Sequence, residues 1–137
     1  MRLLPLAMAV AFLVSAAACS RTAVSDITIT LDNLTDTPVG LYINDAWVGT
    51  YPAGWSVQEP LGDHGGAPYL VDVRTASGAS LIRADVNEAQ AASLVDGGPA
   101  IAVEHGVACG IIRLVIGELA ADEAPAPARS VEPGPCP

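Results

Sequence analysis

The sequence predicts an all-β fold, a small antiparallel β-sandwich of about eight short strands with one short helix. Apolar and polar residues alternate with a period of two in several segments, as they do in half-buried strands. Turn residues separate these segments at spacings of about ten residues, which is typical of sandwiches and barrels. A single segment, residues 87–95, breaks the alternation.

Four strands are expected in the first half of the fold. The alternation over residues 27–32 and 39–43 indicates two of them. Asn44-Asp45 follows, and both residue types tolerate the left-handed backbone of a tight turn. Residues 46–51 are therefore expected to return as the hairpin partner, and residues 54–59 to form a further short strand.

Four more strands are expected in the second half. Residues 61–68 ("LGDHGGAP") are predicted to form a loop, followed by strands at residues 69–74 and 80–86. The last two strands are expected at residues 99–105 and 109–119. The final run is almost continuously apolar, which predicts a central strand covered on both faces.

The helix is expected over residues 87–95. Asn87 can cap a helix whose first residue is the acidic Glu88, and Gly97-Gly98 can end it. We expect one or two helical turns between these signals.

Composition divides the chain into four parts. Residues 1–18 combine a positive start, an apolar stretch and small residues, which is the layout of a signal peptide. Their apolar stretch is shorter than the roughly 20 residues that a membrane-spanning helix needs. Residues 19–25 are expected to form a tether, residues 26–119 the β-sandwich domain, and residues 120–137 a disordered tail rich in proline and alanine.

The expected cleavage site lies between Ala18 and Cys19. Ala16-Ala17-Ala18 satisfies the small-x-small rule of a signal peptidase. A cysteine at the next position resembles the lipobox of bacterial lipoproteins, although position 16 is Ala where that family usually has Leu. The resemblance implies that the Cys19 thiol receives a diacylglyceryl group and anchors the chain to the cell membrane. Without that lipid the protein would be secreted.

The three cysteines are Cys19, Cys109 and Cys136. Lipidation of Cys19 would leave two, which can pair as Cys109–Cys136 in an oxidising extracytoplasmic compartment. The alternative is that Cys19 stays a free or intermolecular thiol.

The chain is strongly acidic. It carries 15 acidic and 6 basic residues, for a net charge of −9, and it has no lysine. Because phosphates would be repelled, nucleic acid and anionic membrane surfaces are disfavoured as partners. The charges are spread along the chain, as solubility alone would also require.

One stretch carries a second family resemblance. Residues 39–52 ("VGLYINDAWVGTYP") resemble the PEGA-type surface domain, with apolar-x-apolar, a short Asn/Asp/Gly turn, and then aromatic-Val-Gly-Thr and Pro. Residues 65–74 ("GGAPYLVDVR") are similar to a later strand of that family, and the resemblance spans about residues 37–75. It departs at Asp45, where the family usually has Gly. The resemblance implies a small β-sandwich with a binding or spacer role in a cell-surface protein.

The hairpin geometry predicts which side chains share a face. With Asn44-Asp45 as the turn, the expected cross-strand pairs are Ile43 with Ala46, Tyr42 with Trp47 and Leu41 with Val48. Val48 is then expected on the core face, and Tyr42, Trp47 and Tyr51 together on the opposite face. Such an aromatic strip can stack on sugar rings or contact a partner. The alternative is that it is covered, or that it only stabilises the hairpin.

The two histidines, His64 and His105, each follow an acidic residue, Asp63 or Glu104. A metal site needs three or four convergent ligands, so solvated loop histidines, no metal and no cofactor are expected. Neither a phosphate-binding loop with Lys-Ser/Thr nor a G-x-S-x-G motif occurs, so no catalytic residues are assigned. A pocket that joined Asp63, His64 and His105 would favour an enzyme instead.

These observations predict a non-catalytic lipoprotein of the bacterial cell envelope that acts as a structural or interaction module. Its expected partners are the membrane, through the N-terminal lipid, and an envelope protein or carbohydrate. The alternative is a carbohydrate- or peptide-binding module that uses Tyr42, Trp47 and Tyr51.

Overall fold

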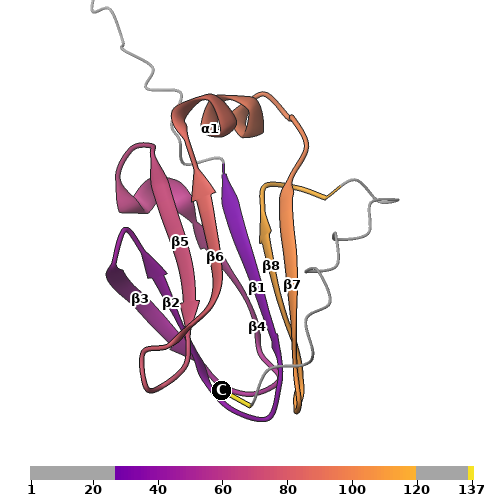
Figure 1. The fold of residues 1–137 in the computed structure, drawn as a ribbon. Helices are drawn as coiled ribbons and strands as arrows, with labels where there is room; N and C mark the ends of the chain where they lie inside the picture. The colour runs from indigo at the N-terminus through magenta and orange to yellow at the C-terminus, as the bar shows by residue number, and fades with distance from the viewer. Residues whose placement is uncertain (1–26, 120–135) are drawn as a thin grey trace, which may run out of the picture.

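The computed structural model of the protein describes residues 27–119 and 136–137. These residues form two four-stranded antiparallel sheets that pack face to face (Figure 1). The predicted all-β sandwich with one α-helix is confirmed. The predicted signal peptide, the tether with Cys19, and tail residues 120–135 lie outside the described residues.

Both sheets are antiparallel throughout. The first sheet has the order β4-β1-β8-β7, with β4 (Ser56–Pro60), β1 (Thr28–Leu34), β8 (Gly110–Ile116) and β7 (Ile101–Val107). The second sheet has the order β3-β2-β5-β6, with β3 (Ala46–Tyr51), β2 (Val39–Ile43), β5 (Tyr69–Arg74) and β6 (Ser80–Val86). The chain passes between the sheets four times, and the second sheet is complete at β6 before β7 and β8 complete the first.

The core lies between the sheets. Alternate residues of each strand point inward, as the period of two predicts. The fully buried side chains include Ile29 and Leu31 of β1, Leu41 and Ile43 of β2, Val71 and Val73 of β5, and Ile112, Leu114 and Ile116 of β8. The last strand is central, as predicted, but Ile111 on its outer side remains 41% exposed. The prediction that both faces of β8 are covered was therefore wrong.

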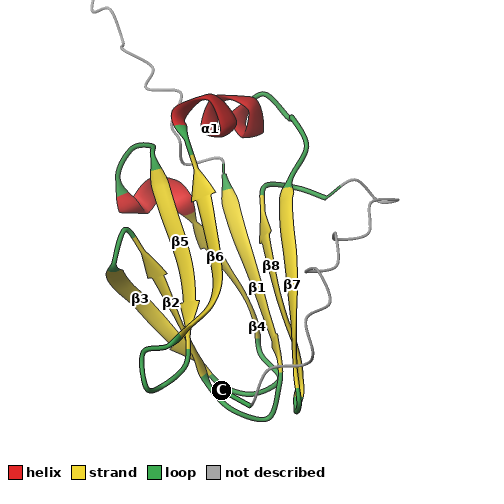
Figure 2. Ribbon diagram, viewed as in Figure 1, coloured by secondary structure: helices red, strands yellow, loops and turns green. Residues whose placement is uncertain are grey.

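Two short helices complete the fold (Figure 2). Helix α1 (Glu88–Val95) lies across one end of the sandwich between β6 and β7, and Asn87 caps it as predicted. The Asn87 side chain accepts a hydrogen bond from the Gln90 backbone N–H, and the Gln90 side chain accepts one from the Asn87 N–H. A 3₁₀-helix, η2 (Leu61–His64), lies where only a loop was expected, because the fully buried Leu61 draws this segment against the core.

Within residues 27–119 and 136–137, no helix is both long and apolar enough to cross a membrane.

Candidate functional site

The β2–β3 hairpin forms the turn that the sequence predicts. Asn44 and Asp45 have φ angles of 52° and 63°, the left-handed region that Asn and Asp tolerate. Ile43 pairs with Ala46, and Tyr42 pairs with Trp47. The first two predicted cross-strand pairs are therefore confirmed.

The third predicted pair is wrong, because β3 contains a bulge. The register shifts between Tyr42 and Leu41, so that Leu41 lies opposite Gly49 rather than Val48. One extra residue reverses the alternation of every later side chain in a strand. Val48 still packs against the core, as expected.

Tyr51 consequently lies on the other side of the sheet from the predicted strip. Its ring packs against the core, and its hydroxyl lies so close to Gly49 that a Cβ there would come within 2.8 Å of it. Burial, followed by the charge of Glu59, raises the pKa of Tyr51. The predicted strip therefore reduces to Tyr42 and Trp47.

Trp47 is the most exposed large apolar residue of the described chain, at 63%. Its indole Nε1–H donates to the Thr50 hydroxyl at 3.2 Å, which orients the ring. An exposed tryptophan whose orientation is held by a side-chain hydrogen bond presents a preformed flat surface to a ligand.

Arg74 lies over the ring of Tyr42, the cross-strand neighbour of Trp47, on the same outer side of the second sheet. Its Cζ is 4.2 Å from the centroid of the Tyr42 ring, the geometry of a cation–π contact. Its Nε donates to Asp72 at 2.7 Å and its Nη2 to Asp45 at 2.6 Å. These hydrogen bonds, first that with Asp72 and then that with Asp45, raise the pKa of Arg74.

Asp72 is the buried anchor of the network. It is only 2% exposed, and it also accepts a hydrogen bond from the Ser80 hydroxyl at 2.5 Å. Asp45, by contrast, is the open end of the network, because its side chain is 71% exposed. We call Tyr42, Asp45, Trp47, Asp72 and Arg74 the Trp47 face.

The histidines are not solvated loop residues, contrary to the prediction. His64 belongs to η2, and its Nε2 lies 2.9 Å from Oε1 of Glu59 rather than pairing with Asp63. Glu59 pairs with Ile29 of β1, whose side chain points into the core. The Glu59 carboxylate therefore lies on the same side of the sheet, at the edge of the core. An inward charge on an edge strand discourages pairing with another sheet.

His105 lies far from this pair in the fold. It is a half-buried residue of β7, at the opposite edge of the first sheet from β4. The structure therefore does not bring Asp63, His64 and His105 into one pocket. Glu59 was not identified from the sequence as the partner of His64. The only sequence signal for its inward position was that Glu59 lies two residues after Val57, on the same side of β4.

A second polar surface lies on the outer side of the first sheet. A cavity of about 450 Å³ is lined there by Thr28, Thr30, Asp32, Gln58, Arg113, Val115, Gly117, Glu118 and Leu119. Arg113 is held between Glu104 at 2.7 Å and Asp32 at 3.8 Å. Its charge is thus already matched within the protein.

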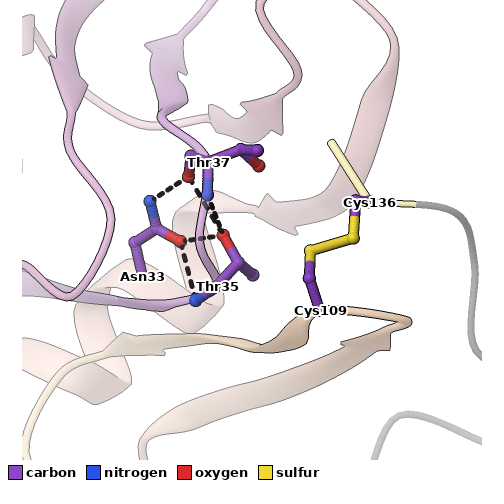
Figure 3. Close-up of a disulfide and its surroundings, with 5 residues drawn as sticks. All are labelled: Asn33, Thr35, Thr37, Cys109 and Cys136. Atoms are coloured by element: carbon purple, nitrogen blue, oxygen red, sulfur yellow. Dashed lines mark hydrogen bonds between the residues drawn. A yellow bond between two sulfur atoms is a disulfide. The ribbon is translucent and has the colours of Figure 1, made fainter.

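Cys109 and Cys136 are joined at disulfide distance, with their Cα atoms 5.5 Å apart (Figure 3). Cys109 lies in the turn between β7 and β8, and the carboxylate of Asp36 is close to both sulfurs. The structure therefore brings the two cysteines of the predicted pair to disulfide distance, with the Asp36 carboxylate beside them.

Comparison of the chain with protein-family models, with curated proteins and with solved structures found no match.

Proposed function

We propose that the protein is a non-catalytic interaction module of the bacterial cell envelope, anchored to the membrane by a lipid on Cys19, with the Trp47 face as its contact surface. The observation that carries the proposal is the exposed, hydrogen-bonded indole of Trp47 beside the Tyr42–Arg74 stack. Interfaces are enriched in Trp, Tyr and Arg, and their centres are depleted of other charged groups.

The sequence around Trp47 supports this role. Strand β3, Ala46–Tyr51, contains no charged side chain, although the chain carries 15 acidic residues. A partner that approaches this segment avoids most of the repulsion that the acidic surface produces elsewhere.

The cysteine arrangement supports the lipid anchor. With Cys109 joined to Cys136, Cys19 is the one cysteine left for a different role. Its place after Ala16-Ala17-Ala18 matches lipid attachment followed by cleavage. A lipid at residue 19 would hold the sandwich close to the membrane through a tether of only a few residues.

The anchor is tested by mass and by location. The intact mass of the detergent-extracted protein should correspond to a chain that begins at Cys19 and carries a diacylglyceryl group. Cys19→Ser should move the protein from the membrane fraction to the soluble fraction. A wild-type protein that is soluble and unmodified would show the anchor to be wrong.

The contact surface is tested with a matched pair of tryptophans. Trp47 and Trp55 are similarly exposed, at 63% and 58%, but Trp55 lies outside the Trp47 face. Purified protein should co-sediment with isolated cell envelopes, Trp47→Ala should abolish this binding, and Trp55→Ala should leave it unchanged. Equal binding by both variants would reject the Trp47 face as the contact surface.

A further inference from the structure

We propose that the Trp47 face binds a neutral glycan, with one sugar ring stacked on Trp47 and its hydroxyls bonded to Asp45 and Arg74. This inference rests on the proposed interaction role, and it names the ligand class of the same face.

The aromatic part of the face suits a sugar ring. One face of a pyranose carries mainly C–H groups, which pack on an indole, while its edge carries hydroxyls. The Trp47 ring is held by its bond to Thr50, so little orientational freedom is lost when a ligand stacks on it. Tyr42 is its direct cross-strand neighbour. Tyr42 lies on β2, between Trp47 on β3 and Arg74 on β5, so the strands that carry Trp47 and Arg74 are two strand spacings apart, roughly 9.6 Å.

The polar part of the face suits hydroxyl groups. A hydroxyl both donates and accepts, and the Asp45–Arg74 pair offers an acceptor and a donor side by side. Within the described chain, the two aspartates engage the Nε and Nη2 groups of Arg74, which leaves donor capacity on the guanidinium. Asp45 is the exposed member of the pair, so a ligand can reach it without displacing the core.

The charge of the face selects a neutral ligand. Within the face, Asp45 and Asp72 outweigh Arg74, and Arg83, which lies opposite Asp72 on β6, shares its exposed side of that strand with Asp85. The face therefore has no net positive charge to attract a uronic acid or a phosphate, and the acidic chain as a whole repels anions. A peptide strand is a poorer fit, because the bulge in β3 interrupts the sheet edge beside Trp47.

The experiment measures binding of defined oligosaccharides by calorimetry. The neutral probes are chitohexaose, cellohexaose and maltohexaose, and the acidic probe is an oligogalacturonate of similar length. At least one neutral probe should bind, and the acidic probe should bind at least ten-fold more weakly. Trp47→Ala should weaken neutral binding ten-fold or more, Trp47→Phe less, and Trp55→Ala not at all.

A second readout follows Trp47 directly. In the Trp55→Phe background, Trp47 is the only tryptophan of the chain, so a neutral probe that stacks on it should shift the emission maximum. Asp45→Asn, which changes an exposed side chain, should weaken binding several-fold while the circular dichroism spectrum stays the same. Binding without an emission shift would place the sugar elsewhere and overturn the inference.

The outcomes separate the two proposals. If no neutral probe binds, or the acidic probe binds equally well, the glycan inference is wrong. If envelope binding still depends on Trp47 in that case, the interaction role stands and the partner is of another class. If envelope binding does not depend on Trp47, both proposals fail.

Discussion

The guanidinium of Arg74 lies over the ring of Tyr42, with 4.2 Å between Cζ and the ring centroid. Asp72, two residues earlier on the same strand, holds the Nε of Arg74 at 2.7 Å. Because Asp72 is almost completely buried, its charge is stable only beside this cation. The buried carboxylate of Asp72 thus fixes the Arg74 side chain on the outer side of the second sheet.

Replacing the cation should therefore destabilise the fold. Arg74→Met leaves the Asp72 carboxylate buried without its charged partner. The free energy of unfolding should fall by about 2–3 kcal/mol. In Arg74→Met/Asp72→Asn, which removes both charges, part of this loss should be recovered. Urea denaturation of the wild type, Arg74→Met, Asp72→Asn and the double variant measures the coupling, and additive losses would argue against it.

The two neighbours in β3 should respond differently to substitution. Val48→Asp places a charge against the core and should cost about 1–3 kcal/mol. Trp47→Ala removes an exposed ring and should cost less than about 1 kcal/mol. Thermal melts of the two variants compare these effects. A lower melting temperature for Trp47→Ala than for Val48→Asp would mean that Trp47, rather than Val48, packs on the core.

Asn33, near the end of β1, should be critical for the stability of the loop between β1 and β2 (Figure 3). Its side-chain amide donates to the carbonyls of Thr37, Tyr51 and Pro52, and its Oδ1 accepts from the N–H and hydroxyl of Thr35. Asn33→Ala would leave several buried groups without partners, so we expect a loss of about 2–4 kcal/mol in urea denaturation.

Thr37 supplies the matched control for that substitution. Its hydroxyl is buried and has no hydrogen-bond partner within the described chain, whereas its backbone carbonyl accepts from Asn33 and Thr35. Thr37→Val keeps the backbone bonds and the shape, so stability should stay the same or rise slightly. A large loss in Thr37→Val would show that the hydroxyl does have a partner in solution.

Stability should decrease at alkaline pH through Tyr69. Its ring is buried, its hydroxyl donates to the Gly65 carbonyl at 2.6 Å, and burial raises its pKa above the usual value of about 10. The folded chain then holds this proton more tightly than the unfolded chain. The contribution is complete below about pH 10 and is lost as the pH rises through the raised pKa.

Tyr69→Phe tests this assignment. At about pH 8 it should lose about 1 kcal/mol with the hydrogen bond to Gly65. Above about pH 10 its free energy of unfolding should fall less steeply than that of the wild type. Tyr51, whose pKa is also raised, should account for part of the remaining slope. Parallel pH profiles for wild type and variant would exclude Tyr69 as a source of the decline.

The Cys109–Cys136 link should have a moderate effect on stability. It joins residues 27 apart in the sequence, for which chain entropy sets an upper limit of about 3–4 kcal/mol. Within the described part of the closed segment, residues 109–119 and 136, the one strand is β8, so Cys136→Ser should cost less than this limit and leave the sandwich folded. Peptide mapping without reductant should recover the linked peptides, and two free thiols in the freshly purified protein would contradict the assignment.

Local signals in the sequence were sufficient for the strands and the helix. Alternation with a period of two located each strand because one face of every strand packs on the core. The Asn44-Asp45 turn and the Asn87 cap follow from backbone preferences of single residues, which do not depend on distant contacts. The two cross-strand pairs nearest the turn, Ile43 with Ala46 and Tyr42 with Trp47, were predictable for the same reason.

Only the tertiary structure decided the composition of the candidate face. The bulge at Val48 reversed the alternation and moved Tyr51 to the core side, and nothing in the local pattern marks that extra residue. Arg74 reaches Tyr42 because β5 pairs with β2, and His64 reaches Glu59 because η2 folds back on β4. Sheet order is set by which strands bury their apolar faces together, a property of the whole chain rather than of any one segment.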